Sequence, residues 1–153
     1  AITAPGEPAV YVYANVDDGM TRGADVEGGA TLGRLRLEGS VSALGTRDDA
    51  TGRPLLGRPA RSGRLTASGP LPFGVRASVT ALHTGRTPMT RDAATGAVTG
   101  WRDAFVRTDL RLTRRLGRAG RGPELVLGAD NLLDRQPAQW AGFTGRHVYT
   151  ALS

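Results

Sequence analysis

Apolar and polar residues alternate along several stretches of this chain, and this alternation is the strongest constraint on its fold. Between residues 34 and 43, the apolar or small residues are Leu35, Leu37, Gly39, Val41 and Ala43, and the polar ones are Arg34, Arg36, Glu38, Ser40 and Ser42. A period of two is the side-chain period of a β-strand. The pattern therefore predicts strands with one apolar and one polar face. It fits a soluble sheet and a membrane barrel equally, because both alternate.

The composition favours an all-β fold and argues against a conventional hydrophobic core. Of the 153 residues, 39% are hydrophobic and 22 are glycine, and few windows place apolar residues at helical spacing. Glycine in a helix interior costs about 1 kcal/mol relative to alanine. No stretch of about 18 apolar residues is present, so no transmembrane helix is expected. A membrane β-barrel also lacks such a stretch, because only every second residue of its strands faces lipid.

The chain is strongly basic, with a net charge of +6, and its cationic residues other than two histidines are all arginine. Such a surplus raises binding to nucleic acid or another polyanion as a hypothesis. The arginines are spread over strand positions and turns, however, and aromatic residues for base stacking are scarce. A soluble all-β binding module for a polyanion or nucleic acid therefore stays as the alternative function. The absence of cysteine excludes disulfides, thiolate chemistry and cysteine metal ligands.

The alternating stretches predict an antiparallel up-and-down meander of about seven strands. The expected strands are 10–30, 34–47, 60–68, 74–86, 101–115, 124–133 and 145–153, with a bend or bulge near 17–19. The connections between them alternate between short ones at 32–33, 69–73 and 117–122 and longer ones at 48–59, 87–100 and 134–144. Outer-membrane barrels have this arrangement, with short periplasmic turns and long extracellular loops.

The two-residue period also assigns each side chain to a face. The residues expected on a shared apolar, outer face are Leu35, Leu37, Val41, Val75, Val79, Val106, Leu110, Leu112, Leu125 and Leu127. Those expected on the opposite, inner face are Arg36, Glu38, Arg76, Arg107, Asp109 and Arg111. In a barrel the inner face lines a water-filled lumen, and in a soluble sheet it is solvated.

Four motifs follow one another along the chain in a characteristic order and spacing. They are Tyr13-Ala14-Asn15-Val16 followed by Thr21-Arg22-Gly23-Ala24-Asp25, then Thr51-Gly52-Arg53-Pro54-Leu55-Leu56-Gly57-Arg58-Pro59, then Ala129-Asp130-Asn131-Leu132-Leu133-Asp134, and finally Gly142-Phe143-Thr144-Gly145-Arg146-His147-Val148-Tyr149. Together they resemble the C-terminal part of the TonB-dependent outer-membrane receptors. The chain departs from the family pattern at Asp25, where glutamate is usual, at Leu133, where phenylalanine is usual, and at Ser153, where the family's last strand ends in an aromatic residue.

The resemblance implies that residues 1–153 form a sector of a 22-stranded transmembrane β-barrel in the outer membrane of a Gram-negative bacterium. It implies the C-terminal portion of a receptor, with the plug domain and the earlier strands absent, so we expect no transport from the isolated chain. The implied function is TonB-dependent uptake of a ferric siderophore or a cobalamin-like nutrient, bound by extracellular loops. The implied partners are outer-membrane lipid, that ligand and, through the missing plug, the TonB energy-coupling complex, with no nucleic acid and no enzymatic step.

No catalytic, cofactor-binding or metal-binding residues are expected, and the sequence does not identify the ligand-binding residues. The histidines, His83 and His147, have no carboxylate at metal-ligand spacing and make a poor metal site. Arginines could coat the lumen wall, where they would pair with plug carboxylates or attract an anionic substrate. The arginines expected there are Arg34, Arg36, Arg64, Arg76, Arg102, Arg107 and Arg111.

Two pairs of residues near the last loop each have a structural and a functional interpretation. Asn131 and Asp134 are expected to shape a strand-to-loop transition through bonds to the backbone, or else to line the lumen. Gly145 and Arg146 are expected to start the last strand and to anchor it at the headgroup level, or else to place a cation near an acidic ligand. The structural interpretation is favoured for both pairs.

Overall fold

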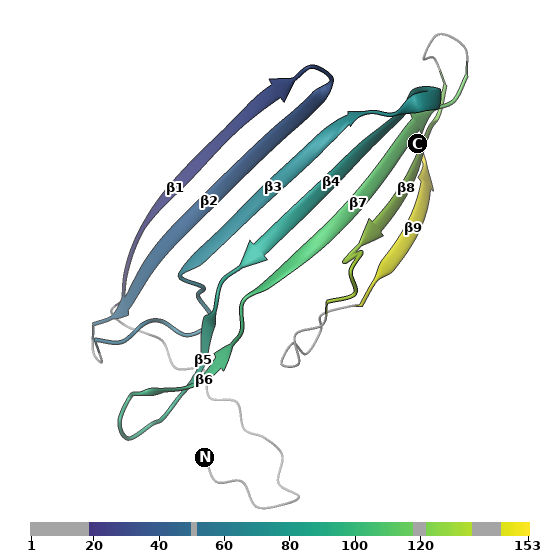
Figure 1. Ribbon diagram of the computed structural model, residues 1–153. Helices are drawn as coiled ribbons and strands as arrows, with labels where there is room; N and C mark the ends of the chain where they lie inside the picture. The colour runs from purple at the N-terminus through teal and green to yellow at the C-terminus, as the bar shows by residue number, and fades with distance from the viewer. Residues whose placement is uncertain (1–18, 50–51, 118–121, 136–144) are drawn as a thin grey trace, which may run out of the picture.

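The described part of the chain folds almost entirely into β-strands. The computed structural model describes residues 19–49, 52–117, 122–135 and 145–153. Its strands are β1 (Gly19–Leu32), β2 (Leu35–Asp48), β3 (Arg61–Pro70), β4 (Val75–Thr84), β5 (Thr87–Arg91), β6 (Val98–Arg102), β7 (Phe105–Arg115), β8 (Glu124–Asp130) and β9 (His147–Leu152). Seven of them form one antiparallel sheet in the order β1-β2-β3-β4-β7-β8-β9, and β5 pairs with β6 in a separate hairpin (Figure 1). A short 3-10 helix, η1 (Pro72–Gly74), lies between β3 and β4.

This topology confirms the predicted all-β class and the predicted meander of seven antiparallel strands. Strands that follow one another in the chain are neighbours in the sheet, except that the β5–β6 hairpin is inserted between β4 and β7. The first expected strand began at residue 10, and its part before residue 19, with the expected bend at 17–18, lies outside the described residues. From Gly19 onward, β1 pairs with β2 along its full length.

Two sequence predictions next to this hairpin are wrong. A loop was expected at 87–100, but β5 and β6 pair there. One strand was expected from 101 to 115, but β6 ends at Arg102 and β7 begins at Phe105. The hairpin strands are short and their register shifts around Thr90, so regular alternation does not mark them in the sequence. Arg102 therefore lies on the hairpin, and the prediction that it lies on the polar wall of the sheet is wrong.

The register of the sheet gathers apolar side chains on one face. One row of directly opposed residues runs across five strands as Leu37, Ala67, Val79, Leu110 and Ala129. The adjacent row runs as Glu38, Thr66, Thr80 and Asp109. Opposed residues point to the same side, and successive residues of a strand point to opposite sides. We call the side of the first row the apolar face and the side of the second row the polar face. Each of the ten residues expected on the outer face lies on the apolar face, and each of the six expected on the inner face by the two-residue period lies on the polar face.

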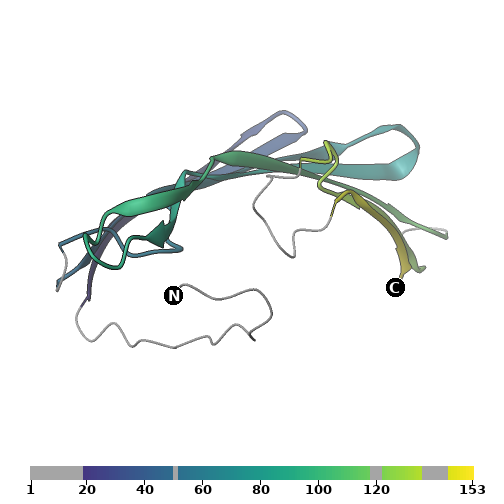
Figure 2. The ribbon, with the colours of Figure 1, turned by 90° about the horizontal axis from the view of Figure 1, so that it is seen from below.

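The apolar face is exposed. The relative exposures of Val26, Val41 and Leu65, on three successive strands, are 71%, 63% and 56%. Among the described residues, the buried hydrophobic side chains are Val126 and Ala129 alone. The sheet is a single arched layer, and no other described strand stacks on its face (Figure 2). A soluble domain normally buries such a face against a second layer. In the part of the chain that the structure describes, no helix is long and apolar enough to cross a membrane.

The short connections lie at one end of the sheet and the long connections at the other, and we call these the turn end and the loop end. The turn end carries the tight connection at 33–34, the η1 connection at 71–74 and the ends of the connection at 116–123 (Figure 1). The loop end carries the segment 52–60, the β5–β6 hairpin and the described ends of the connection between β8 and β9. This confirms the predicted separation of short and long connections for the described residues.

Paired cysteines test this register. The protein has no cysteine of its own, so Ala67→Cys with Val79→Cys places two thiols on directly opposed positions of β3 and β4. We expect mild oxidation to close a disulfide, because opposed Cβ atoms lie about 4.5–5.5 Å apart. The control pair, Ala67→Cys with Thr80→Cys, places its thiols on opposite faces and should stay reduced. Free thiols are counted by alkylation and mass spectrometry, and equal closure of both pairs would contradict the register.

Candidate functional site

The loop end is built from two segments that are distant in sequence and bound to each other. The guanidinium of Arg91, at the end of β5, donates to the carboxylate of Asp48, at the end of β2, over 2.9 Å. The same guanidinium donates to the carbonyl oxygen of Pro54 over 2.6 Å, and the amide of Gly57 donates to the carbonyl oxygen of Pro88 over 2.8 Å. We call these contacts the loop clasp, because they hold the segment 52–60 against the hairpin.

The ion pair of the loop clasp is shielded from water. The side chains of Arg91 and Asp48 expose 16% and 13% of their surface. Removing one member of such a pair leaves the other as a buried, uncompensated charge, which is strongly destabilising. The arrangement therefore fixes the hairpin and the segment 52–60 together more firmly than an exposed ion pair would.

Local hydrogen bonds stabilise each of the two segments that the loop clasp joins. The turn after β2 closes through bonds between the Gly52 amide and the Asp48 carbonyl (2.7 Å) and between the Leu55 amide and the Thr46 hydroxyl (3.0 Å). Gly52 has φ +67°, a conformation that glycine adopts without steric cost. On the other side, the fully buried Thr87 donates its hydroxyl to the carbonyl oxygen of Gly85 over 3.0 Å.

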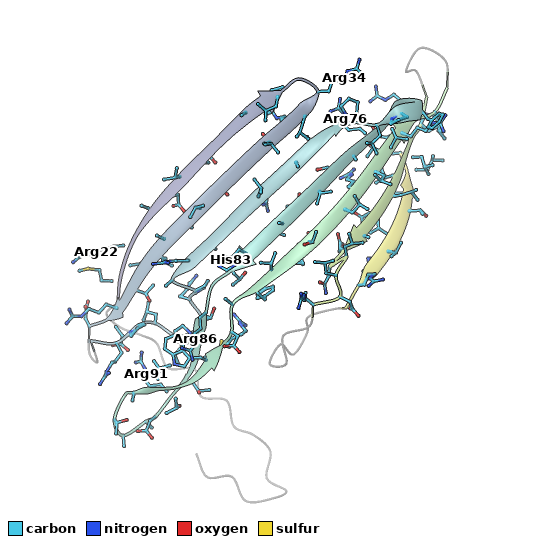
Figure 3. The ribbon with its side chains drawn as sticks, viewed as in Figure 1. Arg22, Arg34, Arg76, His83, Arg86 and Arg91 are labelled. Carbon is cyan, nitrogen blue, oxygen red and sulfur yellow. The ribbon has the colours of Figure 1, made fainter. Side chains whose placement is uncertain are left out.

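The hairpin has its own stabilising contacts. The guanidinium of Arg86 lies 4.6 Å from the ring centroid of Trp101, within the range of a cation–π interaction. At the hairpin tip, one carboxylate oxygen of Asp92 accepts bonds from the Thr95 amide (2.7 Å), the Thr95 hydroxyl (2.8 Å) and the Ala94 amide (3.1 Å). The Thr95 amide, followed by the Thr95 hydroxyl, lowers the pKa of the Asp92 carboxyl below its ordinary value. Figure 3 shows Arg86 and Arg91 together at the loop end.

Asn131 and Asp134 have the structural role that the sequence favours. Asn131 is 2% exposed, and its side-chain amide accepts from the Arg135 amide (3.0 Å) and donates to the Arg135 carbonyl (3.1 Å). Its backbone amide donates to the carboxylate of Asp109 on β7 over 2.9 Å. Asp134 accepts from the Arg146 amide over 2.9 Å, which joins both ends of the connection between β8 and β9. These side-chain-to-backbone bonds confirm the predicted strand-to-loop transition.

The expected arginine wall is present in part. Arg36, Arg64, Arg76, Arg107 and Arg111 lie on the polar face, Arg34 lies in the turn at 33–34, and Arg102 lies on the hairpin. Two of these arginines pair with a carboxylate two residues further along their own strand. Arg36 bonds Glu38 over 2.7 Å, and Arg107 bonds Asp109 over 2.9 Å. The polar face is thus a wall of mixed charge.

An open hollow of about 700 Å³ lies on the polar face over β1, β2 and β3. Its polar lining includes Glu27, Thr31, Arg36, Glu38, Arg64 and Thr66. Cations, carboxylates and hydroxyls are interleaved there, so the hollow fits a hydrated polar surface and does not select one charge. Ligand contacts on this face would therefore depend on the neighbouring loops.

The histidines cannot form one metal site. His83 opposes Gly63 and Val106 on the apolar face, whereas His147 opposes Asp130 on the polar face and stacks on Tyr149 with 5.8 Å between ring centroids. Among the described residues, no group of three or more histidine, aspartate or glutamate side chains could hold a metal ion.

No protein-family model and no curated protein sequence matches the chain. The case for a function therefore depends on the sequence pattern and on the geometry described above.

Breaking the loop clasp should release the hairpin. We expect Arg91→Met to cost about 3 kcal/mol of docking free energy, because the shielded Asp48 carboxylate loses its partner. Hydrogen exchange at the Gly57 amide measures this, because that amide donates across the loop clasp to Pro88. Arg53→Met is the matched control on an exposed position of the same segment, and should leave the exchange rate unchanged. Equal exchange in both variants would contradict a stabilising role for the ion pair.

The hairpin tip should respond to acid. Because its folded-state pKa is lowered, the Asp92 carboxyl stabilises the tip above its unfolded-state pKa of about 3.9, and this contribution is lost as the pH falls through the lowered value. Thr95→Ala should raise the pKa of Asp92 only part of the way, since the Thr95 amide still donates. A carboxyl titration by NMR measures both, and an Asp92 that titrates at or above the ordinary value would refute the bonding at the tip.

Proposed function

We propose that this chain is a sector of the wall of a TonB-dependent outer-membrane receptor. Its apolar face would contact lipid, its polar face would line the lumen, and its loop end would lie outside the cell. The whole receptor would bind a ferric siderophore or a cobalamin-like nutrient at the loop end and admit it through the lumen.

The exposed apolar face is the observation that carries this proposal. On β2 it runs without a charge from Leu35 to Ala43, which is about 27 Å at roughly 3.4 Å per residue. With the usual strand tilt of about 40°, this stretch spans about 21 Å along the membrane normal, which is most of the apolar band of outer-membrane barrels, about 25 Å tall. The height of the uncharged stretch thus suits the hydrocarbon layer of a membrane, and no described element covers this face.

The edges of the sheet support a larger barrel. In the described part, β1 pairs only with β2 and β9 only with β8, so each has one edge without a partner strand. A bilayer core offers no water to the free amides and carbonyls of such an edge, and only closed barrels or helices cross it. A membrane-embedded sheet of this kind therefore needs further strands beyond β1 and β9.

The loop clasp supports ligand recognition at the loop end. It holds two connections in one defined arrangement, and a site that is ordered before binding loses less entropy when the ligand arrives. The rival function, a soluble module for a polyanion or nucleic acid, calls for a basic patch on a hydrated surface. The mixed charge of the polar face gives that rival little support.

A pair of arginine substitutions tests the lipid contact. Leu110→Arg places a charge at the middle of the apolar face on β7, and we expect it to cost about 2–4 kcal/mol if that position lies near the bilayer midplane. Thr80→Arg introduces the same side chain in the adjacent row on the polar face, opposite Asp109, and should cost little. Alkaline extraction of outer membranes measures both, with Leu110→Arg released and Thr80→Arg retained.

Two outcomes would contradict the proposal. Release of the unsubstituted protein by alkali would show that the apolar face is not held in lipid. Equal retention of the two variants would show that the face of Leu110 is not the face in contact with lipid.

A further inference from the structure

We propose that the loop-end margin of the apolar face binds the phosphate groups of an anionic lipid leaflet. The inference rests on the proposed function, because it assumes that this face meets lipid, and it adds the charge class of the lipid. The residues are Arg22 on β1, Arg47 on β2, Arg61 on β3 and His83 on β4, which we call the basic margin. The register places all of them on the apolar face, opposite Gly45, Met20, Ala43 and Gly63 respectively.

The two faces of the described sheet differ sharply in charge. The strands carry six arginines and seven carboxylates on the polar face. The arginines are Arg36, Arg64, Arg76, Arg107, Arg111 and Arg115, and the carboxylates are Asp25, Glu27, Glu38, Asp48, Asp109, Glu124 and Asp130. On the apolar face, the ionised strand residues are the three arginines of the basic margin and Arg114, with no carboxylate. The positive surplus of the sheet thus lies on the side that carries no balancing charge.

The basic margin follows the ends of the strands. Arg22 is level with Gly45 of β2, two residues nearer the turn end than Arg47. Arg61 is level with Ala43 and His83 with Val41, so from β1 to β4 the row moves four residues toward the turn end. Strands of a barrel are tilted and staggered, so a net shift of this kind is expected of a row that follows the membrane plane. Figure 3 places Arg22 and His83 toward the loop ends of β1 and β4.

The side chains of the basic margin are available to a ligand. All four residues are exposed, and within the described residues none of the three arginines is paired with a carboxylate. The guanidinium of Arg22 donates to the sulfur of Met20, a weak acceptor, over 3.0 Å. Guanidinium groups bind phosphate oxygens through paired hydrogen bonds, and their stems can lie along an apolar surface while the head reaches the interface.

The turn end of the same face has a different character. Its one charged strand residue is Arg114. The η1 connection at this end exposes Phe73 at 86% and Leu71 at 49%, and aromatic side chains are favoured at a membrane–water interface. Among the strand residues of the apolar face, the basic side chains therefore gather at the loop end.

Flotation with vesicles tests the proposal. The refolded full chain is mixed with vesicles of phosphatidylcholine alone and with vesicles containing one-fifth phosphatidylglycerol. One variant replaces Arg22, Arg47 and Arg61 by glutamine, and the matched control replaces Arg64, Arg76 and Arg111 on the polar face, so both lose the same charge. We expect the first variant to lose on the order of 100-fold in its preference for anionic vesicles, since each interfacial arginine contributes about fivefold, and the control to keep most of it.

Each other outcome has a definite meaning. Equal losses in the two variants would overturn the proposal in favour of a net-charge effect. Binding of the unsubstituted chain to both vesicles without preference would overturn it while leaving the proposed lipid contact intact. Absence of binding to either vesicle would overturn both. Loss of the preference with 10 mM inorganic phosphate, but not with chloride at the same ionic strength, would assign the arginines to a free-phosphate site and overturn a lipid ligand.

Discussion

The structure depends on a sheet that satisfies its backbone hydrogen bonds across seven strands but has almost no core beneath it. In water, a hydrogen bond of this kind adds only about 0.5–1.5 kcal/mol net, because water competes for the same groups. In a bilayer core that competition is absent, and an unmade bond costs several kcal/mol. The same ladder of bonds would therefore be weakly held in water and firmly held in lipid, and under the proposed function lipid would also cover the exposed apolar face. This is the physical reason for preferring a membrane environment over a soluble sheet.

Much of the sheet could be predicted from the sequence, because its alternation is a local signal. The opposed rows that begin at Leu37 and at Glu38 follow directly from a two-residue period once neighbouring strands are antiparallel. The role of Asn131 at the end of β8 could be predicted as well, since an asparagine side chain at the end of a strand commonly forms hydrogen bonds with nearby backbone groups. Both the opposed rows and the role of Asn131 follow from local sequence, without the family resemblance.

The parts that the sequence did not predict depend on long-range geometry. Asp48 and Arg91 are 43 positions apart, and neither belongs to a repeating pattern that points to the other. The β5–β6 hairpin is short and irregular in register, so threonine and glycine there indicated a loop. Gly128 is a third case, because a Cβ at this position would overlap the ring of Tyr149 on β9. Only the pairing of β8 with β9 brings these two residues together.

The distribution of ion pairs separates the parts of the sheet that are tied together from those that are not. Arg36–Glu38 and Arg107–Asp109 each pair residues of a single strand, so these two ion pairs neutralise charge on the polar face without joining opposed strands. Arg115–Glu124 does join β7 to β8, but over 3.8 Å and with side chains that are 61% and 34% exposed. The Arg91–Asp48 pair instead links segments distant in sequence, and it is the most shielded of the four ion pairs among the described residues. A ligand at the loop end would consequently meet an ordered pair of connections. A domain packed against the polar face could exchange contacts with Arg36 or Glu38 without disturbing the strand pairing. Recognition at the loop end and movement along the lumen wall would then be mechanically independent, which suits a wall that stays fixed while a ligand passes.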